Sequence, residues 1–117
     1  MGRPVVHWEI WAEDTKKLAE FYSKLFDWKV DFNNPINYGL VETGGQGGIN
    51  GGIMKPQRGP HPHRLTFYVQ VDDLQACLDK AESLGGKTIF PPTAIPGVGS
   101  YALFSDPEGV YIGLFKP

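Results

Sequence analysis

Residues 5–26 read VVHWEIWAEDTKKLAEFYSKLF, and the architecture can be worked out from this stretch. Its first part, Val5 to Ala12, is rich in β-branched and aromatic residues, which is typical of a strand. Asp14 then stands at a helix N-cap position, where its side chain can accept a hydrogen bond from the first turn. Apolar residues follow at spacings of three and four, so the sequence predicts a helix from Thr15 to Phe26.

The same order of elements then occurs a second time along the chain. After the first helix, Asn, Pro and Gly separate three short segments that we predict to be strands, at 28–32, 36–42 and 50–55. A proline-rich segment, 57–62, is the predicted linker. The second copy contains a strand, a helix capped by Asp72 or Asp73, and three further strands, at 65–71, 74–84, 87–90, 101–105 and 110–115. Residues 91–99 are predicted to form a loop.

The two copies match residue by residue. Asp14 corresponds to Asp73 with an offset of 59 residues, and Gly52 corresponds to Gly113 with an offset of 61 residues. Two copies with a period near 60 indicate a duplicated unit and not a solenoid. We therefore predict an α+β fold with one domain over residues 1–117. It consists of two tandem βαβββ modules, 1–56 and 63–117, with curved mixed sheets and the helices outside.

Alternation along each module's first strand predicts which face is polar. In the first module His7, Glu9 and Trp11 share a face, and in the second module Thr66 and Tyr68 take the equivalent positions. Both modules thus direct polar residues to one side, which predicts a concave polar cavity. The opposite face of 65–71 is apolar throughout, and we expect it to pack under a helix.

Composition excludes several classes of function. The chain has 117 residues, a net charge of −2 and dispersed basic residues, so nothing indicates a nucleic-acid partner. No stretch approaches the roughly 18 apolar residues of a membrane span, and the N-terminus has no signal-peptide pattern. The single cysteine cannot form an internal disulfide, so we expect a cytoplasmic protein.

Several motifs together resemble the vicinal oxygen chelate superfamily, which contains glyoxalase I, bleomycin-resistance proteins and extradiol dioxygenases. The resemblance lies in four segments. They are the opening strand at 5–10, the first helix with its sequences FY and LFDW at 19–28, the second helix at 71–87 and the closing turn at 104–109. The resemblance covers essentially the whole chain, and the chain is similar to short glyoxalase-like members of the superfamily. It implies the βαβββ fold and a homodimer, but it does not specify a reaction, because one fold hosts many chemistries.

The resemblance also implies four metal-ligand positions, one on each of four strands, for a divalent ion that binds two substrate oxygens. In this chain those positions hold His7, Thr66, Gly52 and Gly113. Only the histidine is a good ligand, so we expect no metal cofactor. We interpret the two glycines as a cavity floor that has been widened by the loss of both carboxylates.

His7 and Glu9 form the best candidate acid–base pair, because a carboxylate can fix the tautomer of a neighbouring histidine. The alternative is that His7 is a structural histidine with its hydrogen bonds satisfied in the core, or that the two residues form an ion pair on the strand surface. The remaining candidate ligand-binding residues line the predicted polar face or supply aromatic walls; they are Trp11, Tyr38, Gly52, Thr66, Tyr68, Tyr101 and Gly113.

Two functions remain open. The first is a protein of the bleomycin-resistance type, which binds a small organic molecule in the cavity without a catalytic metal. The second is a glyoxalase-related lyase or isomerase that uses His7 and Glu9, with or without a divalent metal. A regulatory or structural role is a third possibility, and the cavity could close within one chain or across a dimer.

Overall fold

A computed structural model describes residues 2–56 and 63–117, so the predicted linker at 57–62 lies outside the described residues. The described chain divides into two compact units. The first unit is His7–Leu65, and the second unit combines residues 2–6 with Thr66–Pro117.

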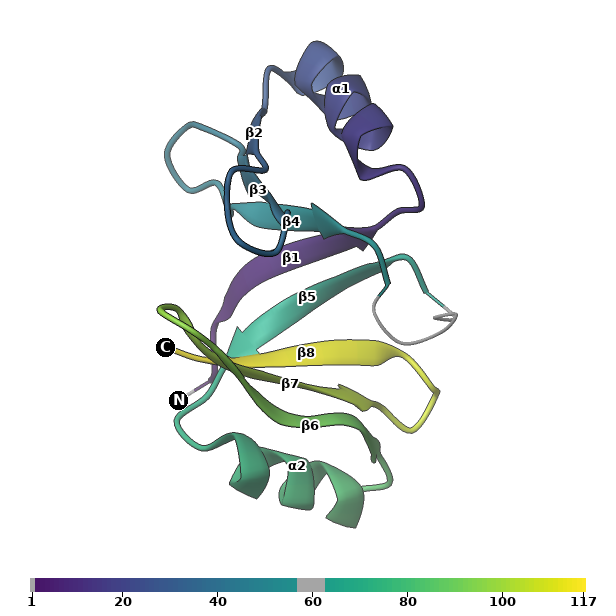
Figure 1. Cartoon of the computed structure of the whole chain (residues 1–117). Coiled ribbons are helices and arrows are strands. Elements are labelled where there is room, and N and C mark those ends of the chain that lie inside the picture. The colour runs from purple at the N-terminus through teal and green to yellow at the C-terminus, as the bar shows by residue number, and fades with distance from the viewer. Residues whose placement is uncertain (1, 57–62) are drawn as a thin grey trace. The chain divides into compact units, whose positions relative to one another are not determined.

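The first unit contains a helix and a four-stranded mixed sheet (Figure 1). Its strands lie in the order β2-β3-β4-β1, with β1 and β4 parallel and the other pairs antiparallel. The elements are β1 (Val5–Trp11), whose first two residues are grouped with the second unit, α1 (Thr15–Phe26), β2 (Lys29–Asp31), β3 (Gly39–Glu42) and β4 (Gly51–Met54).

The second unit repeats this arrangement in the order β5-β8-β7-β6, with β5 and β8 parallel. Its elements are β5 (Leu65–Gln70), α2 (Leu74–Ser83), β6 (Lys87–Ile95), β7 (Gly99–Ser105) and β8 (Tyr111–Lys116). The predicted α+β fold with two βαβββ repeats is therefore confirmed. The longest helix in the described ranges has 12 residues, and no described helix is long and apolar enough to cross a membrane.

The two helices begin where their capping residues predict. The Asp14 carboxylate accepts a hydrogen bond from the backbone N–H of Lys17, and the Asp73 carboxylate accepts one from Ala76, each at 3.0 Å. Each interaction satisfies a backbone donor that the first helical turn leaves without a partner. Of the two candidates for the second cap, Asp73 therefore has this role.

Each unit has its own apolar core beneath its helix. In the first unit Ala12, Ala19, Val41 and Ile53 are buried together, and in the second unit α2 packs on β6, β7 and β8 over a second buried cluster (Figure 1). That second cluster consists of Val71, Leu74, Leu78, Ala102 and Leu114.

Of two expectations about the second unit, one is wrong in part and the other is wrong. The apolar face of 65–71 was expected under a helix; Val69 and Val71 do pack with Leu74 and Leu78 of α2, but Leu65 and Phe67 are 63% and 41% exposed. Residues 91–95, expected in a loop, continue β6 as far as Ile95. The strand tolerates Pro91 and Pro92 because it is the edge strand of its unit, and its pairing with β7 shifts register around them.

Candidate functional site

The candidate site of the first unit begins on β1, where His7, Glu9 and Trp11 share a face, as alternation predicts. Glu9 and Trp11 are both only 4% exposed, whereas His7 is partly exposed. The Trp11 indole Nε1–H donates a hydrogen bond to Glu9 Oε1 at 2.6 Å. Glu9 is thus a buried carboxyl group with a donor from its own strand.

Tyr38 completes this group from the segment that leads into β3. Its hydroxyl donates to Glu9 Oε2 at 2.6 Å and lies 2.8 Å from His7 Nε2. The centroids of the imidazole and phenol rings lie 6.1 Å apart, and the ring planes are 26° from parallel. We call His7, Tyr38, Glu9 and Trp11 the polar array. In it, the two oxygens of one buried carboxyl group each accept a hydrogen bond.

The backbone of Tyr38 is held by a residue that the sequence analysis did not select. The Asn34 side chain accepts from the Tyr38 N–H at 2.9 Å and donates to the Tyr38 carbonyl oxygen at 2.6 Å. Asn34 belongs to the turn signal before Pro35, and asparagine side chains commonly hydrogen-bond nearby backbone in turns. The sequence therefore indicated a turn at Asn34, but it did not indicate that the Asn34 side chain binds the backbone of Tyr38.

Gly52 is what allows Tyr38 to reach the carboxylate. Gly52 lies beside Glu9 in the parallel β1–β4 register, and a Cβ atom at position 52 would overlap the Tyr38 hydroxyl. In the second unit, a Cβ atom at Gly113 would likewise overlap the Tyr68 ring, which lies next to it in register. The interpretation of a widened floor is therefore wrong, because a tyrosine ring fills the space over each glycine.

Burial sets the charge of the histidine. Desolvation lowers the pKa of His7 below its ordinary value, because the charged imidazolium is disfavoured away from water. The imidazole is consequently neutral at neutral pH and carries one N–H.

The candidate residues of the second unit share one face of its sheet. Tyr68 pairs with Gly113 in register, and Thr66 lies two residues before Tyr68 on β5. Tyr101 lies on the same face of β7, and its ring packs edge-on against Phe90 with centroids 6.5 Å apart. The Thr66 hydroxyl donates to the Tyr111 carbonyl oxygen at 2.7 Å. Thr66 and Tyr101 thus each contact a residue of their own unit.

The donor set does not fit the metal that the resemblance implies. Among the described residues, no group of three or more His, Cys, Asp or Glu side chains could hold a metal ion. At the four expected positions, Thr66 is engaged by a carbonyl oxygen and both glycines are covered by tyrosine rings. His7 faces a phenol, and a phenol is a poorer ligand than a carboxylate.

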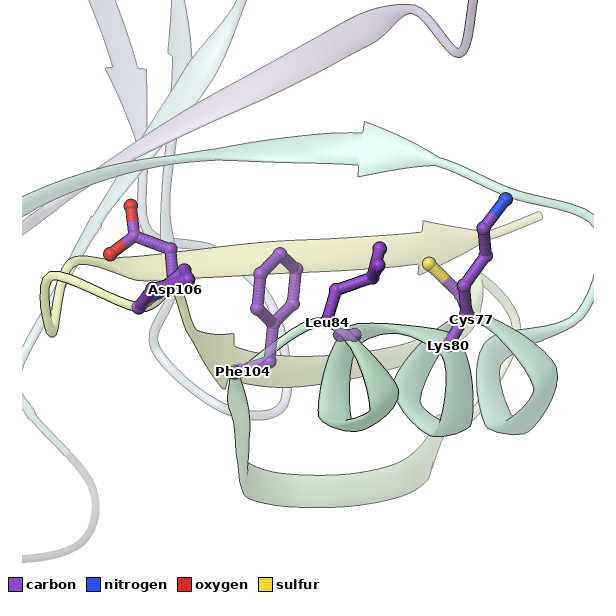
Figure 2. A pocket seen from close by; sticks show the side chains of 8 residues that line it. Cys77, Lys80, Leu84, Phe104 and Asp106 are labelled. Carbon is purple, nitrogen blue, oxygen red and sulfur yellow. The ribbon is translucent and has the colours of Figure 1, made fainter.

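A separate hollow of about 280 Å³ lies on the second unit between α2 and the end of β7 (Figure 2). Its walls are almost entirely apolar, with the Cys77 and Lys80 side chains at the helix and Asp106 at the opposite end. The complete lining is Cys77, Lys80, Ala81, Leu84, Gly86, Phe104, Asp106 and Pro107. None of the candidate site residues lines this hollow.

Several proteins are similar in sequence to more than half of this chain. A glyoxylase-like domain-containing protein of Didymella fabae is 31% identical over 109 residues, which cover 86% of this chain and 84% of that protein. The anthracycline biosynthesis protein DnrV of Streptomyces peucetius is 24% identical over 123 residues, covering 92% of this chain and 45% of that protein. The chain thus spans about half the length of DnrV, and it spans 26% of the length of two mycobacterial relatives.

A solved structure supports the same grouping at the level of the fold. The methylmalonyl-CoA epimerase of Mycobacterium tuberculosis superimposes with a TM-score of 0.67 at 18% identity, over 97% of this chain and 87% of that chain. The sequence model of one family matches residues 5–114, which is nearly the whole chain. This protein therefore belongs to the Glyoxalase/Bleomycin resistance protein/Dioxygenase superfamily.

Proposed function

We propose that this protein binds a small organic molecule at the polar array and does so without a metal ion. The observation that carries the proposal is the arrangement of a partly exposed, neutral histidine over a buried carboxylate, with Tyr38 bridging the two. A buried polar group is costly unless hydrogen bonds compensate it, and buried ionisable side chains concentrate at functional sites. A purely structural strand would fill these positions with apolar side chains at less cost.

Small-molecule binding also agrees with a named relative. DnrV carries the name of an anthracycline biosynthesis protein and matches 92% of this chain. A planar organic ligand that carries oxygen atoms would suit a site in which His7 and Tyr38 combine aromatic rings with polar atoms. Tyr68, Tyr101 and Thr66 remain candidate ligand contacts of the second unit taken by itself.

The second candidate function is a metal-independent lyase or isomerase of the glyoxalase-related type. The hydrogen-bonded path from His7 through Tyr38 to Glu9 favours it, because such a path can hold and move a proton. His7 and Tyr38 would then act on the substrate, and Glu9, which is only 4% exposed, would act through Tyr38. General acid–base catalysis contributes roughly 10²–10⁴-fold, which limits this function to substrates that are already acidic at the reacting carbon.

The assembly and the cellular location are part of the proposal. We expect a homodimer in the cytoplasm, since the resemblance to short glyoxalase-like proteins implies pairing and the single cysteine fits a reducing compartment. Size-exclusion chromatography with light scattering tests the dimer directly.

A thermal-shift screen followed by calorimetry tests the binding function. The panel contains glutathione adducts, antibiotics and aromatic diols, because a bound ligand raises the melting temperature by mass action. We expect a hit whose affinity falls at least tenfold in His7→Ala and is unchanged in Gln75→Ala, a control on the exposed surface of α2. A hit that binds His7→Ala as tightly as the parent protein would contradict the proposed site.

Turnover separates the two functions. If the hit is converted to a product by the parent protein and not by His7→Ala, the lyase or isomerase function replaces simple binding. If the hit is recovered unchanged after long incubation, the binding function stands.

A further inference from the structure

The turn that leads into β3 is built around one asparagine side chain. Asn34 Oδ1 accepts a hydrogen bond from the Tyr38 N–H at 2.9 Å, and Asn34 Nδ2 donates to the Tyr38 carbonyl oxygen at 2.6 Å. The register between β3 and β4 begins at Gly39 and Ile53, so Tyr38 stands just before the first paired residue of β3. A single amide group thus holds both backbone polar groups of Tyr38, as a neighbouring strand would.

Backbone hydrogen bonds and local sequence close this turn. The Asn37 N–H donates to the Asn34 carbonyl oxygen at 3.1 Å, and the Asn34 N–H donates to the Phe32 carbonyl oxygen at 2.8 Å. Pro35 suits the second position of such a turn. Asn37 has a φ of 54°, in the left-handed region that asparagine adopts more readily than most residues. The sequence therefore favours one conformation, in which the Asn34 side chain lies against Tyr38.

The start of the turn is anchored by packing. Phe32 packs against the apolar core of the first unit, and a Cβ atom at Gly39 would overlap the Phe32 ring. The residue that precedes the turn and the first residue of β3 therefore lie in contact. Together with the Asn34 amide, this contact fixes the backbone from which the Tyr38 side chain extends.

We propose that Asn34 is a positioning residue of the polar array, which holds the Tyr38 hydroxyl against His7 and Glu9 before a ligand binds. The hydroxyl lies 2.6 Å from Glu9 Oε2 and 2.8 Å from His7 Nε2, and a displacement of about 1 Å would take both distances out of hydrogen-bond range. A site that is already ordered binds more tightly, because less ordering cost remains at binding. The effect on binding rests on the proposed function, whereas the position of Tyr38 can be tested without a ligand.

Two variants remove the hold on Tyr38. Asn34→Ala deletes the amide, and Asn34→Ser is milder, because serine keeps a polar side chain for the turn but is too short to bond both backbone groups of Tyr38. Asn33→Ala is the matched control. Asn33 is exposed, and its backbone N–H, which the substitution keeps, donates to Asp31 Oδ1.

The pKa of His7, followed by NMR of its imidazole resonances and assigned with His7→Gln, reports the position of Tyr38. Burial lowers this pKa in the parent protein. When the phenol moves away, water reaches the imidazole, so the pKa should rise toward its ordinary value in both Asn34 variants and stay unchanged in Asn33→Ala. A loss of stability alone leaves the pKa in the folded state as it was. A folded Asn34→Ala or Asn34→Ser protein with the parental pKa of His7 would overturn the proposal.

Calorimetry with 2,3-dihydroxynaphthalene, an aromatic diol, tests the consequence for binding. We expect Asn34→Ser to weaken its binding roughly three- to tenfold, the effect of about one net hydrogen bond, and Asn33→Ala to leave the binding unchanged. Parental affinity in Asn34→Ser would overturn the role of Asn34 in binding. If the diol does not bind the parent protein, the pKa of His7 alone decides the role of Asn34, and the thermal-shift panel decides the proposed function separately.

Discussion

Replacing Tyr38 with phenylalanine removes one oxygen atom and keeps the ring. The Tyr38 hydroxyl donates to the buried Glu9 carboxylate at 2.6 Å and lies 2.8 Å from His7 Nε2. A hydrogen bond to a charged group contributes about 1.5–3 kcal/mol, and loss of the contact between the Tyr38 hydroxyl and the partly buried His7 imidazole adds to the cost. We expect Tyr38→Phe to lower the free energy of unfolding by about 2–3 kcal/mol.

Equilibrium urea unfolding, followed by tryptophan fluorescence, measures this loss. In a thermal scan the same change corresponds to roughly 8–12 °C for a domain of this size. Tyr22→Phe is the control, since Tyr22 stacks on Trp28 and removal of its hydroxyl should change the stability by less than about 0.5 kcal/mol.

A double-mutant cycle shows whether the loss comes from the proposed contact. Tyr38→Phe and Glu9→Gln should couple by about 0.5–3 kcal/mol, because the two side chains are in direct contact. Additive effects, or a Tyr38→Phe loss no larger than that of Tyr22→Phe, would refute the reasoning that Tyr38 compensates a buried carboxylate.

The remaining predictions concern the histidine, the glycine and the metal. Because burial lowers the pKa of His7, the unfolded chain takes up this proton first as the pH falls. The stability of the parent protein relative to His7→Gln should therefore be highest above about pH 6.5 and decline below it, in urea titrations across that range; a difference that does not vary with pH would contradict this. Gly52→Ala should destabilise the protein by about 1–3 kcal/mol, because its methyl group overlaps the Tyr38 hydroxyl, and should broaden the Tyr38 ring resonances; normal stability would be the contrary result. Dialysis against EDTA should leave ligand binding unchanged, and metal analysis of the purified protein should find well under one ion per chain; one tightly held ion per chain would show the metal expectation to be wrong.

The helices and the duplicated order of strands could be predicted from the sequence because their signals are local. Asp14 and Asp73 mark both helix starts, and the periodicity of α1 gave its observed bounds, Thr15–Phe26. The second half of β6 was missed because Pro91 and Pro92 are typical of a loop. They become acceptable in a strand only at a sheet edge, and the position of an edge depends on tertiary structure.

The candidate site could be predicted only in part, for a similar reason. Alternation along β1 placed His7, Glu9 and Trp11 on one face, which the structure shows. The bridge from Tyr38 to Glu9 spans 29 residues of sequence, and no local pattern encodes it. The role of Gly52 depends on that hydrogen bond, because the Tyr38 phenol fills the space beside the glycine. The sequence alone therefore suggested an open cavity floor at this position.

The mutual fit of Tyr38 and Gly52 restricts how this framework can change. A carboxylate at position 52, where the resemblance places a metal ligand, would need the volume that the phenol fills. A chain therefore holds either the hydrogen-bonded tyrosine or the carboxylate, and neither single substitution leads smoothly from one to the other. Gly52→Glu alone would clash with the Tyr38 ring, and a small residue at position 38 beside Gly52 would remove the hydrogen bond from Tyr38 to Glu9 Oε2. Conversion between the two kinds of site thus requires both positions to change together.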